Sequence, residues 1–174
     1  MKSDFFLKGK YVSIIPTTPH HLAEYTSWHK WEGDLSILQE EESFANQQDR
    51  ARRLHLLKND TDENSYYLSV IDTEEEIVSL LELYILHTEL YIPNFILKKV
   101  HNGNTMALEA GKLLINYFFS YFKEITSIMF DLPDYRIESI KILEQFGFKK
   151  ITHYYKLNYK NKWQKMIILR LGKD

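Results

Sequence analysis

The hexapeptide Asn102–Ala107 opens the most regular amphipathic stretch of the chain. The first turn of a helix leaves several backbone N–H groups without intrahelical partners, and the helix dipole adds partial positive charge there. Such a place binds anions, and small side chains such as Gly103 and Ala107 let a pyrophosphate approach the backbone closely. The Thr105 hydroxyl and the Asn102 amide can donate hydrogen bonds. The hexapeptide therefore predicts an anion site, although the same residues are also typical of an ordinary turn before a helix.

The helix that follows is predicted over Gly103–Tyr121, because its apolar residues recur at spacings of three and four and form one stripe. They are Met106, Ala110, Leu113, Leu114, Tyr117, Phe118 and Tyr121. Three predicted strands precede this helix, namely Ser65–Ile71, Glu76–Ile85 and Tyr91–Lys98. Pro93 lacks a backbone donor near the start of the third strand, which indicates an edge position or a bulge.

The remaining segments complete one domain. A strand is predicted over Lys10–Pro16, and Thr18 and Pro19 suit the N-cap and first position of a helix that runs to about Lys30. Ser43 is a suitable N-cap for a second helix. After the long helix come a strand, a helix ended by a glycine, and a strand pair: Glu124–Leu132, Asp134–Phe146 with Gly147, Phe148–Leu157 and Trp163–Leu171. Without repeats or linkers, residues 1–174 are expected to form a single α/β domain around one mixed sheet.

This order of elements, from about Leu7 to Leu171, resembles the GCN5-related N-acetyltransferase superfamily, most of all its branch of ribosomal-protein N-terminal and spermidine N-acetyltransferases. The family pattern Arg/Gln-x-x-Gly-x-Gly/Ala lies between the fourth strand and the third helix, where this chain has Asn102–Ala107. Arg136–Phe148 is similar to the family's Asn-x-x-Ser-x-x-x-Tyr-x-x-x-Gly-Phe helix and exit, and Asn161–Trp163 to the turn between its last two strands. The resemblance implies a mixed, mostly antiparallel sheet of about seven strands flanked by helices.

The same resemblance implies acetyl-CoA as co-substrate and an amine as acceptor, with direct attack of the amine on the thioester. In the family, the fourth and fifth strands separate, and pantetheine lies between them like an added strand. The residues expected to contact coenzyme A here are Phe95, Ile96, Leu97, Lys98, Asn102, Gly103, Asn104, Thr105, Met106, Ala107, Arg136 and Ser139. Thr105 departs from the family's central glycine, and Asn102 departs from its leading Arg or Gln.

The groups that would move protons depart from the family as well. The usual acid is a tyrosine in the helix before Gly-Phe, and this chain has Leu143 there, which cannot donate a proton. Tyr154, on the next strand, is the expected substitute, with core packing as the alternative. Among strand carboxylates, Glu82 and Glu89 are candidate bases, and Glu89 lies close to a glutamate of the spermidine branch. The expected catalytic pair is Glu89 and Tyr154. The alternative for Glu82 and Glu89 is that their carboxylates simply face solvent.

Two functions are consistent with these residues. One is an N-acetyltransferase that acts on a primary amine, either a small cationic molecule or a protein N-terminus. The acidic run Glu40–Glu42 suits a cationic acceptor, or it is simply a solvated loop rim. The other function is that of a fold relative that has lost catalysis and serves as a binding or regulatory module, which Leu143, Thr105 and Asn102 favour.

Composition argues against several other classes. A net charge of −2 does not favour a nucleic-acid partner, and the absence of cysteine removes disulfides and thiolate sites. The seven histidines lack metal-ligand spacing, so no metal is expected. No run approaches the roughly 18 apolar residues needed to span a bilayer, and Met1–Lys10 does not read as a signal peptide. We expect a cytoplasmic protein without a membrane partner, and the resemblance allows a homodimer.

Overall fold

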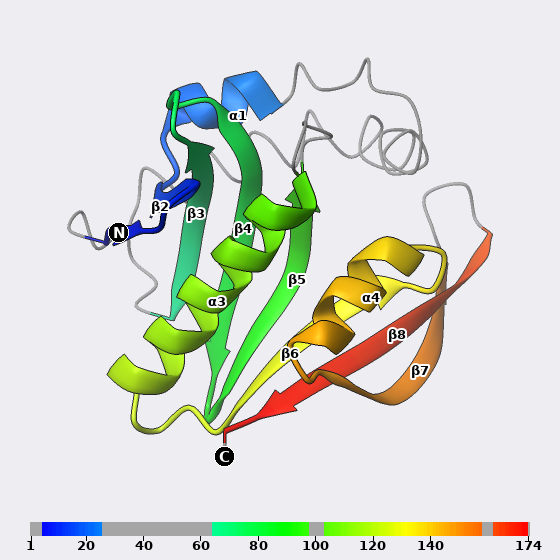
Figure 1. Ribbon diagram of the computed structural model, residues 1–174. Helices are drawn as coiled ribbons and strands as arrows, with labels where there is room; N and C mark the ends of the chain where they lie inside the picture. The colour runs from blue at the N-terminus through cyan, green and yellow to red at the C-terminus, as the bar shows by residue number, and fades with distance from the viewer. Residues whose placement is uncertain (1–4, 26–63, 98–102, 158–161, 174) are drawn as a thin grey trace.

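The computed structural model describes residues 5–25, 64–97, 103–157 and 162–173 (Figure 1). Within them, eight strands form one sheet in the order β1-β2-β3-β4-β5-β6-β8-β7. The strands are β1 (Leu7–Lys8), β2 (Val12–Pro16), β3 (Ser65–Asp72), β4 (Ile77–Leu86), β5 (Glu89–Leu97), β6 (Ser127–Pro133), β7 (Lys149–Leu157) and β8 (Trp163–Gly172). The helices are α1 (Pro19–Tyr25), α3 (Gly103–Tyr121) and α4 (Ile137–Gln145).

The sheet is mixed and mostly antiparallel, as the sequence predicts. β5 and β6 run parallel, and every other pair of neighbouring strands runs antiparallel. The structure has one strand more than the seven expected. This strand is β1, and its two residues are too short a run to show an alternating pattern in the sequence. Its hairpin with β2 is tied to α3, because the Glu109 carboxylate accepts backbone N–H bonds from Lys10, Tyr11 and Val12 at 2.7, 2.7 and 2.9 Å.

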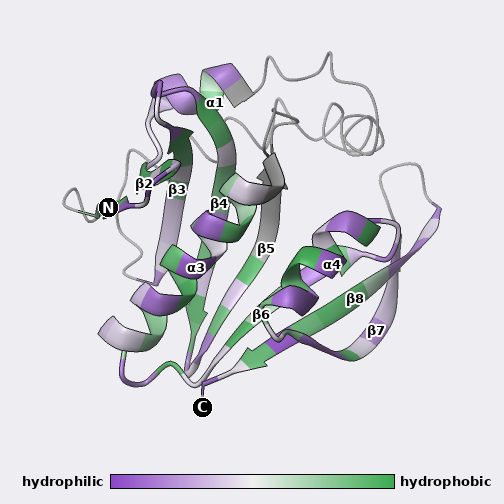
Figure 2. Cartoon of the chain, viewed as in Figure 1, coloured by the Kyte–Doolittle hydropathy of each residue, from purple (hydrophilic) through white to green (hydrophobic). Residues whose placement is uncertain are grey.

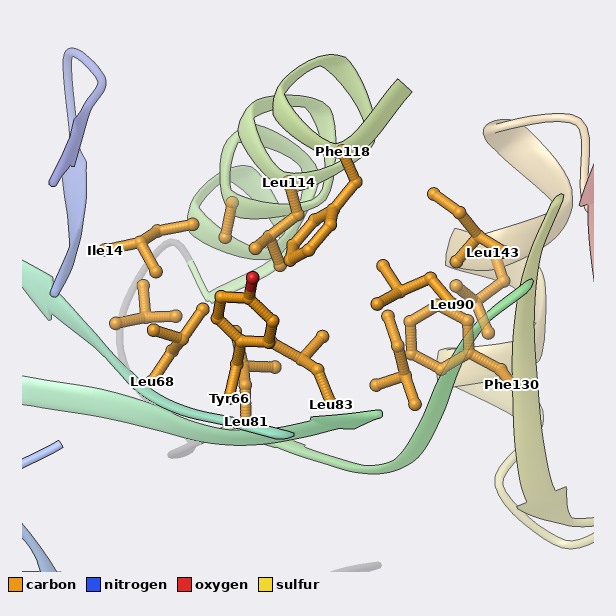
Figure 3. Close-up of a cluster of buried hydrophobic side chains, with 14 of the residues drawn as sticks. Ile14, Tyr66, Leu68, Leu81, Leu83, Leu90, Leu114, Phe118, Phe130 and Leu143 are labelled. Carbon is orange, nitrogen blue, oxygen red and sulfur yellow. The ribbon is translucent and has the colours of Figure 1, made fainter. Parts of the chain in front are cut away.

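The hydrophobic core lies between the sheet and α3. Figure 3 shows Leu114 and Phe118 pointing from α3 toward Leu81 and Leu83 on β4, and Figure 2 shows apolar residues along β4, β6 and β8. Phe118 and Leu83 are fully buried. Each buried side chain of this size stabilises the fold by about 1.5–3 kcal/mol relative to exposure. This packing fixes α3 across the strands that lead into it, and so fixes where the helix begins.

The predicted N-cap of α1 is confirmed. The Thr18 Oγ1 accepts the His21 N–H at 3.2 Å, and His21 Nδ1 accepts the Thr18 N–H at 3.2 Å. This reciprocal pair is a capping box with histidine in place of the usual Glu or Gln. The remainder of the helix predicted to Lys30 and the helix predicted after Ser43 lie outside the described residues.

The predicted start of the next helix is wrong by three residues, since α4 begins at Ile137 and not at Asp134. The Asp134 N–H bonds to the Lys165 carbonyl of β8 at 3.1 Å, and a tight turn joins the Arg136 N–H to the Pro133 carbonyl at 3.1 Å. The sheet therefore holds Asp134, although the residue types from Asp134 onward suit the start of a helix. Gly147 has φ of 88°, the left-handed conformation predicted for the residue that ends this helix.

No helix among the described residues is long and apolar enough to cross a membrane.

Candidate functional site between the separating strands

β5 and β6 lie side by side only at their beginnings, and the last residue pair that joins them is Ile92–Phe130. Beyond that pair, β5 continues to Leu97 along β4 alone, and β6 continues to Pro133 along β8 alone. The two parallel strands therefore separate, and the sheet opens between them (Figure 1). In the open stretch, backbone N–H and C=O groups of β5 that point away from β4 have no strand partner among the described residues.

The opening begins at an irregularity in β5. The register between β4 and β5 shifts between Glu82, which pairs with Asn94, and Tyr84, which pairs with Tyr91. Two β5 residues, one of them Pro93, thus oppose one residue of β4. A bulge bends its strand, and proline has no N–H with which to continue pairing. Of the two alternatives predicted at Pro93, an edge position or a bulge, the structure has the bulge.

The N-termini of two helices, α3 and α4, lie at the open end of the sheet. β5 and β6 run parallel, so their carboxyl ends lie at the same edge, and α3 and α4 are the helices that follow them. The first helical residues are Gly103 and Ile137. The first turn of a helix leaves N–H groups without intrahelical partners, so this edge favours a negatively charged ligand, although the Ile137 N–H already donates to the Tyr135 carbonyl at 2.9 Å.

An apolar pocket lies on the face of the sheet that α3 and α4 cover, over the paired β5 and β6 residues that lead up to the opening. Leu143 of α4 lines it and lies beside Leu90 and Phe130 in Figure 3. The other lining residues are Ile92, Ala107, Gly111, Leu114, Ile115, Ile128, Ile142, Phe146 and Phe148. The pocket can therefore hold a small apolar group but offers no side chain that could exchange a proton.

A polar cluster occupies the opposite face of the sheet at the same level. The Asp131 carboxylate accepts hydrogen bonds at Oδ2 from the hydroxyls of Tyr154, at 2.5 Å, and Tyr91, at 3.1 Å. Burial and the Asp131 carboxylate raise the pKa of both tyrosines. Both hydroxyls therefore stay protonated at neutral pH and act as donors to Asp131.

Glu82 belongs to the same face. It is only 9% exposed, and it lies in β4 opposite Asn94, at the start of the open stretch of β5. The hydroxyl of Tyr84 donates to its Oε1, and burial together with this bond raises the pKa of Tyr84. A carboxylate thus lies buried in β4 at the level where the opening begins.

The two expected catalytic residues are not brought together. Glu89 begins β5 at the closed end of the strand pair, where it accepts a hydrogen bond from Ser127 at 3.0 Å and contacts Arg170 at 2.7 Å. Tyr154 does lie in the polar cluster, but its proton points at Asp131. Its raised pKa makes it a weak acid, so the geometry favours Tyr154 as a residue that positions the Asp131 carboxylate.

The residues expected to bind coenzyme A follow the opening, and their contacts with it stay predictions. Phe95, Ile96 and Leu97 belong to the stretch of β5 that pairs with β4 alone, and their side chains lie outside the described part. Lys98, Asn102 and the side chain of Asn104 also lie outside it, and of Gly103 only the helical backbone is described. In α3, Thr105 is exposed, Met106 is partly buried and Ala107 is buried. In α4, Arg136 is the buried N-cap and Ser139 is partly buried.

Asp131 and Tyr91 are the site residues that the sequence did not reveal. Asp131 interrupts the apolar strand Ser127–Pro133, and a single charged residue in such a strand was the available signal. Its tyrosine partners come from two other strands, a pairing that no local spacing encodes. Within the described residues, no group of three or more His, Asp or Glu side chains is arranged to hold a metal ion.

No family model and no curated protein matches the sequence, whereas solved structures do match. A ribosomal-protein alanine acetyltransferase from Vibrio fischeri is 15% identical, with 98% of each chain covered and a TM-score of 0.69. A single-residue mutant of the spermidine N-acetyltransferase from Vibrio cholerae is 14% identical, with 94% of this chain and 95% of that chain covered and a TM-score of 0.68.

A third solved structure extends this likeness. A GCN5-related N-acetyltransferase from Brucella melitensis is 14% identical, with 97% of this chain and 78% of that chain covered and a TM-score of 0.73. The chain therefore has the GCN5-related N-acetyltransferase fold, as its sequence predicts. At these identities the likeness establishes the fold alone.

Proposed function

We propose that this chain is an N-acyltransferase that moves an acetyl group from acetyl-CoA to a primary amine. The observation that carries the proposal is the opening between β5 and β6, with an apolar pocket next to its start on the helix face and the buried carboxylate of Glu82 on the other face. A thioester bound in the opening would present its carbonyl between these faces. An amine could then approach from the carboxylate side.

The described residues fit an acyl-pantetheine. Its amide groups need backbone partners of the kind that β5 leaves unpaired beyond Ile92, and its acyl group needs an apolar recess like that beneath Leu143. Its pyrophosphate needs donors and positive potential, which the first turn of α3 supplies near Gly103 and Thr105. The hydroxyl-bearing Thr105 is exposed at that turn and can donate to a phosphate oxygen.

The reaction needs a deprotonated amine. The amine nitrogen attacks the thioester carbonyl carbon, a C–N bond forms, the C–S bond breaks, and coenzyme A leaves as a thiolate. We assign the removal of the amine proton to Glu82, the buried carboxylate nearest to the start of the opening in the β4–β5 register. Leu143 cannot protonate the thiolate. Since a free thiol has a pKa of about 8.5, the thiolate can leave and collect its proton from solvent.

Release of free coenzyme A thiol in the presence of an amine tests this proposal. We expect release with at least one member of a panel of spermidine, an aminoglycoside, benzylamine and short peptides, and little release without amine. Mass spectrometry should show the amine gaining one acetyl group. The absence of thiol release and acetylated product across the panel, from folded protein that binds acetyl-CoA, would contradict catalysis.

That negative result would favour the second function, a binding module of the same fold. The observation behind this alternative is that Leu143 is 5% exposed in an entirely apolar pocket wall, so no side chain there can serve as the acid. Such a module would bind acetyl-CoA without turning it over. Binding and turnover measured on one sample therefore separate the two functions.

A further inference from the structure

Asp131 lies where the sheet begins to open, one residue beyond Phe130, the last β6 residue paired with β5. Phe130 and Leu132, on either side of it, are buried in the core. Because side chains alternate along a strand, Asp131 points to the opposite face, away from α3. Asp131 therefore lies on the face from which the amine approaches in the proposed reaction.

The two oxygens of the Asp131 carboxylate have different surroundings. Oδ2 accepts both tyrosine hydroxyls, from Tyr154 at 2.5 Å and from Tyr91 at 3.1 Å. Oδ1 is buried and has no hydrogen-bond partner in the described part of the chain. A buried carboxylate oxygen without a donor is unfavourable, so this atom suits a ligand that brings an N–H group.

The tyrosines determine which ligand fits. Both donate to the same oxygen, so they hold the carboxylate in one orientation and leave the buried Oδ1 without a donor from the described residues. Tyrosine hydroxyls carry no charge, so they orient Asp131 without neutralising it. Glu82 adds a second carboxylate close enough to contribute to the raised pKa of Tyr91. A cationic donor is therefore favoured over a neutral one.

We propose that Asp131 binds the ammonium group of the acceptor through Oδ1, with Tyr91 and Tyr154 as positioning residues. The site thereby selects cationic primary amines as acceptors. This inference rests on the proposed acyl transfer, and it adds the acceptor class and the residue that recognises it. Glu82 then serves as the proton acceptor for an amine that Asp131 has already placed beside the opening.

The test measures amine binding separately from turnover. Benzylamine and spermidine, two amines of different shape, are titrated by calorimetry into the full chain, with and without 1 mM coenzyme A. Asp131→Asn keeps the shape of the side chain and removes its charge, so we expect it to weaken binding of both amines by about tenfold to a hundredfold. Its dissociation constant for acetyl-CoA should stay within about twofold of the wild-type value.

Two further variants complete the design. Glu124→Gln removes one negative charge from an exposed residue in the connection between α3 and β6, at the closed end of the strands, and should leave amine binding unchanged. Tyr154→Phe removes one donor from Oδ2 and should raise the KM for benzylamine while the KM for acetyl-CoA stays the same. Because Tyr154 is 37% exposed, this variant should fold even if Asp131→Asn does not.

The outcomes separate the two proposals. Loss of amine binding in Asp131→Asn, with acetyl-CoA binding retained, supports the inference. If the folded wild type binds acetyl-CoA but neither amine, or if Asp131→Asn and Tyr154→Phe bind both amines as the wild type does, Asp131 is a structural residue and the inference is overturned. Failure of the wild type to bind acetyl-CoA at all would instead overturn the proposed acyl transfer.

Discussion

Replacing Glu109 by glutamine perturbs the contact that ties the first hairpin to α3. The carboxylate accepts backbone N–H bonds from Lys10, Tyr11 and Val12, residues about a hundred positions away in the chain. Glutamine keeps one acceptor oxygen but presents an NH₂ group in place of the other. At least one of the three donors therefore loses its partner, and the remaining bonds lose the contribution of the charge.

The size of the effect follows from the exposure of the donors. The bonds from Lys10 and Tyr11 are exposed, and water can replace the carboxylate there, so we take about 0.5 kcal/mol for each. The bond from Val12 is partly buried, and exchanging its charged acceptor for a neutral amide oxygen costs about 1–2 kcal/mol. The sum is about 2–3 kcal/mol, or about 4–12 °C in Tm for a chain of this length.

The effect should also depend on pH. Burial opposes the charged form of Glu109, but the three backbone donors outweigh it and hold the pKa of the carboxyl below its ordinary 4.5. A lowered pKa in the folded state means that the stabilisation is fully present above about pH 4.5 and is lost as the pH falls further. The gap between wild type and Glu109→Gln should therefore narrow in acid.

Urea denaturation at pH 7 and pH 4 measures both effects. Glu138→Gln is the matched control, because Glu138 is also a helical glutamate but its 3.0 Å ion pair with Lys141 is exposed, and such pairs contribute little. We expect the control to change the free energy of unfolding by less than about 0.5 kcal/mol. Equal stability of Glu109→Gln and the control at pH 7 would refute this assignment for Glu109.

Three further predictions concern other parts of the molecule. Gly111→Ala places a Cβ 2.7 Å from the Phe146 ring, so urea denaturation should show a net loss of about 0–2 kcal/mol after the gain in helix propensity. Burial and the charge of the neighbouring His20 lower the pKa of His21, so α1 should lose stability as the pH falls below 6.5. Thermal melts at several pH values should show this loss in the wild type and not in His21→Gln. In steady-state assays, Glu82→Gln should lower kcat/KM by about 10²–10⁴-fold, and Glu89→Gln by less than about threefold; the reverse order would restore Glu89 as the base.

The long-period features of the sequence determine much of the fold. The stripe of apolar residues predicts Gly103–Tyr121, which are the bounds that α3 has. The missing donor of Pro93 predicts an edge position or a bulge, and the strands separate at a bulge there, while Gly147 predicts the end of α4. These predictions succeed because a period of several turns, a missing donor or a positive φ is a property of the local chain.

The contacts that build the site are not local. Tyr154 reaches Asp131 across 23 positions, and Tyr91 reaches it across 40. Strand order decides such pairings, and the sequence gives no register between strands that are distant in the chain. Glu89 illustrates the consequence, because its type and its place before the strand suit a base, yet strand direction puts it at the closed end beside Arg170.

The most direct measurement for the central claim is a calorimetric titration of acetyl-CoA into wild type, Gly103→Glu and Gly172→Glu. Gly103 begins α3, where a carboxylate would repel the pyrophosphate, whereas a Cβ at Gly172 meets nothing within 4 Å at the end of β8. We predict measurable binding by wild type and Gly172→Glu, and a loss of at least about a hundredfold in folded Gly103→Glu. Equal affinity of all three proteins, or no heat with wild type at millimolar acetyl-CoA, would contradict a coenzyme A site at the start of α3.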